Sequence, residues 1–258
     1  MERIGVLKLL AAVSDCRTTL MMRAVTAGCG RALRHRCWSD KRSMPARSGN
    51  GNDSCRSVRT ENTLGAVHEE TSAVKQMAVI YHSGHGRTEY FAKHVVAGVR
   101  NVAGAEVSLL KADELVATPA RLAAYDGIIW GSPTYFGGVS GPFKSFMDST
   151  SPLFRTQELR GKLASGFTVS SYPSGDKQST LMSMVVFSMQ HGMLWVGNPP
   201  NLENNAGATP DAALDRLGSW TGAMAQIHHK APVDSFDKGD LETAKLFGAN
   251  FARTLRRI

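Results

Sequence analysis

Cysteine is missing from most of this 258-residue chain. The four cysteines, Cys16, Cys29, Cys37 and Cys55, all precede residue 77, and their spacings match no familiar zinc pattern, so we expect no metal site. The rest of the chain cannot use a thiol mechanism, and its lack of cysteine fits a reducing compartment.

Long apolar runs and acid-base constellations are missing too. The apolar run at residues 6–13 is too short to cross a membrane and is followed by Asp15, so we expect no membrane span. No convincing carboxylate pair or catalytic triad can be picked out along the chain. We therefore expect acid-base catalysis by side chains of the protein to contribute little to any reaction.

Basic residues gather at the start of the chain. Residues 1–76 carry 13 Lys and Arg against 7 Asp and Glu, whereas residues 77–258 carry 17 against 15. An organellar transit peptide and a nucleic-acid-binding arm are both compatible with such a leader. Acidic residues interrupt it, however, and its arginines show no helical stripe and no interleaved aromatics. We therefore expect a disordered extension and no nucleic-acid binding, with Met77 as a candidate start of the functional protein.

A short apolar run at residues 77–81 ends in the turn Ser-Gly-His-Gly-Arg-Thr of residues 83–88. The run is typical of a strand buried on both faces of a parallel sheet, and the apolar spacing from Arg87 onward predicts an amphipathic helix. The first amides of that helix and the hydroxyls of Ser83 and Thr88 suit a phosphate. An ordinary strand-to-helix turn with a serine cap is the alternative. The turn is neither a P-loop nor a dinucleotide fingerprint, because both glycine spacings are absent.

Strands and helices alternate through the rest of the chain. This order predicts right-handed crossovers and a doubly wound, five-stranded parallel α/β sheet with helices on both faces. Ligands of such sheets lie at the carboxyl ends of the strands. A long excursion at residues 197–220 interrupts the last strand. Beyond the first strand and helix, we expect strands at 106–110, 126–131 and 163–170 and from 193, and helices at 118–125, 142–149, 179–191 and 239–256.

Two more loops follow strands of this sheet. Residues 131–141 combine Pro133, which stiffens the turn, with Tyr135 and Phe136 beside mobile glycines, and this suits a planar ring whose edge bonds to the backbone. Alone, that segment would be interpreted as a surface loop over the core. Residues 170–176 are rich in hydroxyls and turn formers, which by themselves predict only a loop. Three such loops at strand ends together predict one ligand site.

These motifs resemble the flavodoxin-like NAD(P)H:quinone oxidoreductases of the tryptophan-repressor-binding-protein (WrbA) type. The resemblance covers residues 77–258 and rests on Ser-Pro-Thr-Tyr-Phe-Gly-Gly-Val-Ser-Gly from Ser132, Gly-Lys-Leu-Ala-Ser from Gly161 and His-Gly-Met from His191. It implies a flavodoxin-like FMN-binding domain. The resemblance places the FMN phosphate on Ser83, Gly84, His85, Gly86, Arg87 and Thr88, one side of the isoalloxazine against Pro133, Thr134, Tyr135, Phe136 and Gly137, and the far side against Ser170, Ser171, Tyr172, Pro173 and Gly175.

Two further residues are assigned through the same resemblance. His191 matches a family histidine that reaches the flavin from another subunit or loop, and Phe154 takes the place of an aromatic that covers the substrate cavity. From the sequence alone, His191 before Gly192 favours a cationic cap at a helix C-terminus, and Phe154 favours core or rim packing.

The chain departs from the family pattern at two places. His85 replaces a tyrosine that contacts the nicotinamide cofactor in the family. The glycine-rich third loop has become Ser-Tyr-Pro-Ser-Gly-Asp-Lys from Ser171, which is stiffer and bulkier. We expect these two changes to affect the choice of electron donor or acceptor more than they affect FMN binding.

The resemblance implies an enzyme that transfers a hydride from NADH or NADPH to FMN and then two electrons to a quinone, with the flavin carrying the chemistry. It also implies a homotetramer or homodimer with shared sites, and we expect a cytoplasmic protein. A flavodoxin-like electron carrier and an NAD(P)H-dependent FMN reductase stay open as alternatives. The near-balanced charge of residues 77–258 offers little acidic field for docking a carrier to its partner.

Overall fold

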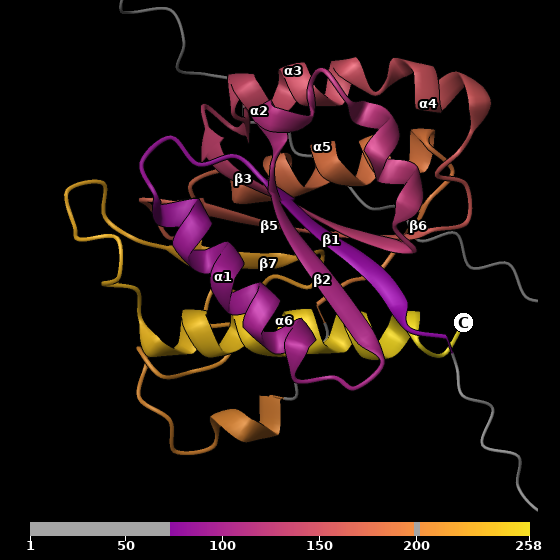
Figure 1. Ribbon diagram of the computed structural model, residues 1–258. Helices are drawn as coiled ribbons and strands as arrows, with labels where there is room; N and C mark the ends of the chain where they lie inside the picture. Colours follow the sequence, from indigo (N-terminus) through magenta and orange to yellow (C-terminus); the bar gives the residue numbers. More distant parts are fainter. Residues whose placement is uncertain (1–72, 199–201) are drawn as a thin grey trace, which may run out of the picture. The chain divides into compact units, whose positions relative to one another are not determined.

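A parallel sheet covered by helices on both faces makes up the folded part of the chain (Figure 1). The computed structural model describes residues 73–198 and 202–258, so the predicted extension lies almost wholly outside the described residues. The first strand begins at Lys75, two residues before the expected start of the strand. The doubly wound α/β fold is confirmed, whereas the disordered extension and the start at Met77 stay predictions.

The strands pair in the order β2-β1-β3-β5-β6, with β7 also pairing with β5. Right-handed connections run outward in both directions from the β1 and β3 pair, so a crevice opens at the carboxyl ends of these two strands. The elements are β1 (Lys75–Tyr81), α1 (Arg87–Arg100), β2 (Ala105–Lys111), α2 (Ala112–Leu115), η1 (Pro119–Ala124), β3 (Gly127–Tyr135), β4 (Gly138–Val139), α3 (Gly141–Ser149), α4 (Ser151–Thr156), β5 (Leu163–Ser170), α5 (Lys177–Gln190), β6 (Leu194–Trp195), η2 (Leu202–Asn205), β7 (Ala223–Gln226) and α6 (Lys238–Leu255).

The fifth position of the sheet is shared by two short strands. The strand β6 pairs with the start of β5, at Leu163 and Ala164, and β7 pairs with its end, from Phe167 to Ser170. The chain leaves the sheet between them, which confirms the predicted interruption of the last strand. The consequence is that β7 ends at the same edge as the other strands and brings a further loop to the crevice.

The segment after the expected end of the third strand is a hairpin rather than a simple loop. The strand β3 continues to Tyr135, and Thr134 pairs with Val139 of β4 across the turn. The hydroxyl of Ser132 accepts a hydrogen bond from the backbone amide of Ser140 at 2.9 Å and closes the base of the hairpin. The prediction of a loop beginning at residue 131 was therefore wrong, because these small polar residues extend the pairing.

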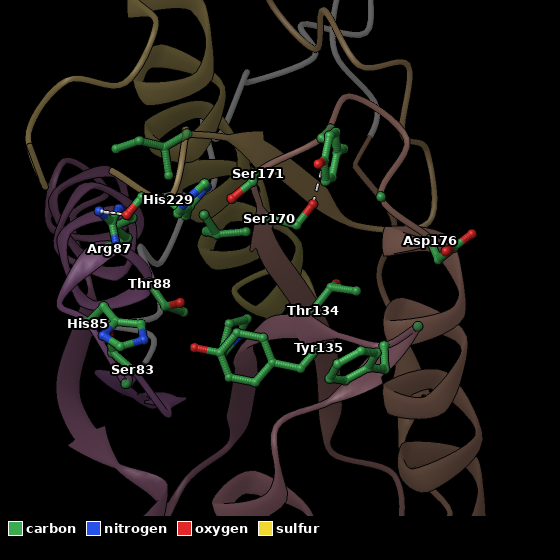
Figure 2. A pocket seen from close by; sticks show the side chains of 18 residues that line it. Ser83, His85, Arg87, Thr88, Thr134, Tyr135, Ser170, Ser171, Asp176 and His229 are labelled. Carbon is green, nitrogen blue, oxygen red and sulfur yellow. Dashed lines mark hydrogen bonds between the residues drawn. The ribbon is translucent and has the colours of Figure 1, made fainter. Parts of the chain in front are cut away.

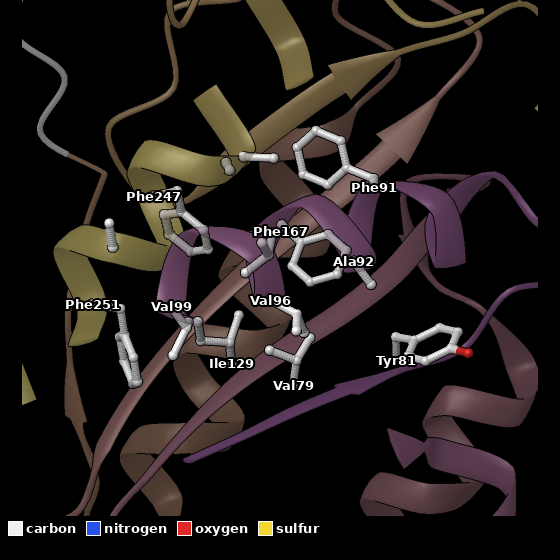
Figure 3. Close-up of a cluster of buried hydrophobic side chains, with 14 of the residues drawn as sticks. Val79, Tyr81, Phe91, Ala92, Val96, Val99, Ile129, Phe167, Phe247 and Phe251 are labelled. Atoms are coloured by element: carbon white, nitrogen blue, oxygen red, sulfur yellow. The ribbon is translucent and has the colours of Figure 1, made fainter. Parts of the chain in front are cut away.

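Two apolar clusters cover the two faces of the sheet. On one face, Phe91 of α1 and Phe247 of α6 pack with Val79 of β1 and Phe167 of β5 (Figure 3). On the other face, helices α3, α4 and α5 cover a cluster around Trp130. The sheet is thus buried on both sides, as the apolar strand sequences predict.

Candidate functional site

A cavity of about 380 Å³ lies at the carboxyl ends of β1, β3, β5 and β7. The three loops that follow β1, β3 and β5 all contribute to its walls, as predicted. Figure 2 shows Ser83 and His85 on one side, Tyr135 below and Ser170 and Ser171 above. Of the predicted flavin-binding residues, the lining contains Ser83, Gly84, His85, Arg87, Thr88, Pro133, Thr134, Tyr135, Phe136, Gly137, Ser170, Ser171, Tyr172 and Gly175.

The first loop leads directly into helix α1. Gly86 is the N-cap residue of α1 with φ of 80°, a left-handed conformation that favours glycine. It shapes the turn without lining the cavity. Thr88 is buried in the first turn of the helix, where unpaired amides and the helix dipole favour an anion.

Two buried donor atoms beside this helix start have no hydrogen-bond partner among the described residues. They are Ser83 Oγ and Arg87 Nε, and both side chains line the cavity. A buried polar atom without a partner is costly unless a ligand or water satisfies it. A phosphate group accepts hydrogen bonds from hydroxyl and guanidinium donors alike, so this end of the cavity fits the phosphate of FMN.

A fourth wall, which the sequence reasoning missed, comes from the loop after β7. The guanidinium of Arg87 donates through Nη2 to the carbonyl oxygens of His229 and Ala231, the latter at 2.7 Å (Figure 2). The same loop brings Ile227 and His229 into the lining. A strand assigned at 223–226 would have pointed to this loop, since all parallel strands end at one edge. Val169 and Asp176, at the end of β5 and before α5, were also missed.

The turn of the hairpin forms the wall expected for the flavin ring. Phe136 has φ of 50° and Gly137 has φ of 74°, so two successive left-handed residues make the turn. The ring of Phe136 is fully exposed and that of Tyr135 is half-exposed. A Cβ on Gly84 would lie 3.2 Å from the Tyr135 hydroxyl, which shows how closely the first two loops approach each other.

Buried hydroxyl groups tie the hairpin to the sheet below the cavity. Thr134 Oγ1 lies 2.7 Å from Thr168 Oγ1 of β5 and donates to Thr180 Oγ1 of α5 at 2.8 Å. His82 Nδ1 lies 2.8 Å from Ser140 Oγ and links the first loop to the second. Burial lowers the pKa of His82, against an opposing effect of Asp113, so the neutral imidazole is favoured at this link.

His191 and Phe154 lie outside this cavity, in a second one. His191 is the C-cap residue of α5, with its Nε2 2.9 Å from Thr150 Oγ1 and its ring against those of Phe154 and Phe187. The position at the C-terminus of α5 agrees with the cap interpretation, and burial lowers the pKa of His191, which favours the neutral ring. The structure places neither residue beside the predicted flavin site of the same chain, and Pro173 lines a third, separate groove.

The described residues provide neither a cluster of metal ligands nor a helix that could span a membrane. Within residues 73–198 and 202–258, no group of three or more His, Cys, Asp or Glu side chains is placed to hold a metal ion. In the same part of the chain, no helix is long and apolar enough to cross a membrane.

Comparison with known proteins first defines the class. A family described as NADPH-dependent FMN reductase matches residues 103–206. The crystal structure of a flavodoxin, WrbA-like protein from Agrobacterium tumefaciens is similar with a TM-score of 0.54 and 33% identity, over 71% of this chain and 98% of that one. The fold and the cavity are therefore those of a flavodoxin-like protein.

Two curated relatives narrow the class to a family. The chain is 34% identical to an NAD(P)H dehydrogenase (quinone) of Archaeoglobus fulgidus, over 71% of this chain and 98% of the relative. It is 35% identical to Flavodoxin FldP of Pseudomonas aeruginosa, over 70% of this chain and 96% of the relative. The chain belongs to the flavodoxin-like NAD(P)H:quinone oxidoreductase family of the WrbA type.

Proposed function

We propose that this protein is an FMN-dependent NAD(P)H:quinone oxidoreductase. The observation that carries the proposal is the convergence of three predicted loops on one cavity. At the start of α1, two buried donors of this cavity have no partner within residues 73–198 and 202–258. Three relatives named NAD(P)H dehydrogenase (quinone), 32–34% identical, support the assignment. Bound FMN supplies the redox chemistry, accepting a hydride from the nicotinamide and passing two electrons to the quinone.

The contribution of the chain is to bind and orient the flavin and its substrates. Ser83, Arg87 and the first amides of α1 would hold the phosphate, and the unpartnered donors of the two side chains among the described residues support this role. The hairpin turn at Phe136 and Gly137 and the loop 170–176 are placed as the two walls that receive the ring. The exposed aromatic side chains at the mouth offer flat apolar surface for a nicotinamide or a quinone.

The decisive experiment is an absorption spectrum of the purified protein after reconstitution with FMN, followed by assays with NADH and NADPH and a simple benzoquinone. We expect a bound flavin and quinone reduction by at least one of the two nicotinamides. Riboflavin serves as the control ligand, because it has the ring without the phosphate. A protein that acquires no flavin absorbance contradicts the proposal.

An electron carrier is the second candidate, and the relative named Flavodoxin FldP favours it. A carrier bound to FMN would accept electrons from a partner reductase and not directly from NADH or NADPH. The long excursion between β6 and β7 and the near-balanced charge of residues 77–258 favour the enzyme. Direct reduction of the bound flavin by a nicotinamide, followed spectroscopically under anaerobic conditions, separates the two.

An FMN reductase is a third candidate, because the family of that description matches residues 103–206. Such an enzyme releases reduced FMN, whereas the proposed quinone reductase keeps the flavin bound during turnover. Rapid gel filtration after several turnovers distinguishes them, since the flavin elutes with the protein only in a quinone reductase.

We further propose a homotetramer or homodimer in which His191 and Phe154 of one subunit lie near the flavin of another. Their position in a separate, partly apolar cavity supports this arrangement. A fully active monomer in light scattering would contradict it. Cytoplasmic location stays a prediction, and both NADH and NADPH are retained as donors because no charged residue can be assigned to the ribose 2′ position.

A further inference from the structure

The loop 170–176, which is the third wall of the cavity, turns back sharply just before α5. Gly175 and Asp176 are both left-handed, with φ of 53° and 52°. A non-glycine residue in this conformation persists where surrounding contacts hold it. The turn carries the side chain of the next residue, Lys177, back to the loop, where Nζ donates to the carbonyl oxygens of Tyr172 and Pro173, the latter at 3.1 Å.

Lys177 is an unusual residue for such a position, because its side chain is 0% exposed. A buried ammonium group is stable only when polar groups replace the water that it has lost. Here the carbonyl oxygens of the loop replace that water. Asp240 acts on the ammonium group through space, as does Arg216 with opposite sign.

A second, partly buried donor binds the same stretch of backbone. Gln226 of β7 donates through Nε2 to the carbonyl oxygen of Ser171 at 3.2 Å, and its own backbone amide donates to Asp240 Oδ2 at 2.8 Å. Three consecutive carbonyl groups, those of residues 171–173, therefore accept hydrogen bonds from side chains of α5 and β7.

We propose that Lys177 is the positioning residue for the third wall of the flavin pocket: its ammonium group holds the loop 170–176 in the shape that receives the ring. The inference rests on the proposed FMN function and adds to it the residue that sets the shape of this wall. Lys177 itself does not line the cavity, so it acts through Tyr172, whose carbonyl it binds and which does line it.

The charge of Lys177 makes this role sensitive to pH. Burial lowers its pKa to about 8, Asp240 of α6 opposes the shift and Arg216 adds to it. Above pH 8 the amine loses its charge, and the hydrogen bonds to the two carbonyl groups weaken because they are no longer charge-assisted. The affinity for FMN is therefore expected to fall as the pH rises through about 8.

The chain provides a matched control at the opposite end of β5. Lys162 also donates to two backbone carbonyl groups, those of Ala123 and Tyr125, each at 2.6 Å, and burial lowers its pKa too. It precedes β5, whereas Lys177 follows the loop after it. Lys162→Met thus removes the same kind of contact without touching the pocket.

The test compares Lys177→Met, Lys177→Gln and Lys162→Met with the unmodified chain. Flavin affinity is measured by fluorescence titration from pH 6.5 to 9.5, and backbone amide exchange of residues 170–177 is measured on the flavin-free protein. We expect Lys177→Met to weaken FMN binding about tenfold at pH 7, to remove the decline above pH 8 and to speed exchange in the loop. Lys177→Gln should bind FMN with intermediate affinity, because it keeps a donor without the charge.

Lys162→Met should lower the melting temperature and leave FMN affinity, its pH profile and loop exchange unchanged. Equal effects of the two methionine variants, or an unchanged pH profile in Lys177→Met, would overturn the proposal. The pH profile of the unmodified chain needs no variant and tests the role even where a variant fails to fold. If the unmodified chain binds no FMN, the proposed function fails, and the exchange rates alone decide whether Lys177 holds the loop.

Discussion

The cavity at the ends of the strands and the cavity around His191 differ in how complete they are. The first, hereafter the strand-end cavity, is walled by loops of four strands and contains, at one end, donors that have no partner in the part of the chain that the structure describes. The second, the helix cavity, lies between α3, α4 and α5 and is lined by Phe154, Phe187 and His191 among others. The side chain of Phe154 in this lining is half-exposed.

Because of this difference, we expect one cavity to function in a single chain and the other to function only in an assembly of chains. The strand-end cavity has the donors and walls that a flavin needs, so binding of FMN should be a property of the single chain. The helix cavity has an exposed aromatic ring and a buried imidazole whose pKa burial lowers and whose Nδ1 has no hydrogen-bond partner among the described residues. Its residues should affect turnover only where another subunit supplies the flavin.

The strongest test of the strand-end cavity is Arg87→Met. The substitution removes the guanidinium beside the phosphate end and its bonds to the His229 and Ala231 carbonyls. We expect the affinity for FMN to fall about tenfold to a hundredfold, because charged hydrogen bonds are lost, while riboflavin binding changes little. Titration with both flavins measures the ratio. Arg100→Met, at the exposed end of the same helix, is the control, and an unchanged ratio would show that Arg87 is not the phosphate ligand.

Phe154→Ala tests whether the helix cavity belongs to an assembly. We expect FMN affinity to be unchanged in dilute protein, and the KM for quinone to rise about fivefold at concentrations where the subunits associate. Steady-state assays over a range of protein concentrations provide the measurement. Phe136→Ala, in the strand-end cavity, should instead weaken flavin binding at every concentration. If Phe154→Ala also weakens flavin binding at every concentration, as expected for Phe136→Ala, the proposed difference between the two cavities is wrong.

Ser83→Ala has a smaller expected effect that separates binding from folding. The hydroxyl is buried without a partner in the described part of the chain, so removing it should leave the stability of the flavin-free protein unchanged or slightly raised. The affinity for FMN should fall about threefold to tenfold, since one donor to the phosphate is lost. Urea unfolding and flavin titration give the two values. Ser183→Ala on α5 is the control, and a loss of stability without a loss of affinity would contradict the assignment.

The smallest expected effect is a change in protein stability with pH that arises in the helix cavity. Burial lowers the pKa of His191, so below about pH 6.5 the unfolded chain binds a proton that the folded chain resists. The stability should therefore decline as the pH falls through that range, and less so in His191→Asn. Urea unfolding at pH 5.5 and 7.5 measures the difference between the two proteins. Equal pH dependence in both would mean that His191 is not the group responsible.

Much of the strand-end cavity could be predicted from sequence because its parts are local. An apolar run followed by glycine and hydroxyl residues predicts a strand, a turn and a helix start within a dozen residues, and parallel strands bring such turns to one edge. The predictions were weaker where an element depends on a side-chain contact or is very short. The continuation of β3 into a hairpin depends on Ser132 meeting Ser140, and β7 is four residues long and separated from β6 by the excursion.

The doubly wound sheet, the three segments at its edge and the family could all be predicted from short-range sequence patterns, which do not depend on tertiary contacts. The fourth wall with His229, the separate location of His191 and Phe154, and the burial of Lys177 became visible only in the folded chain. The physical reason is that burial and hydrogen-bond partners depend on residues far away in the chain. The carbonyl groups that bind Arg87 lie more than 140 residues further on, and no local pattern predicts that contact.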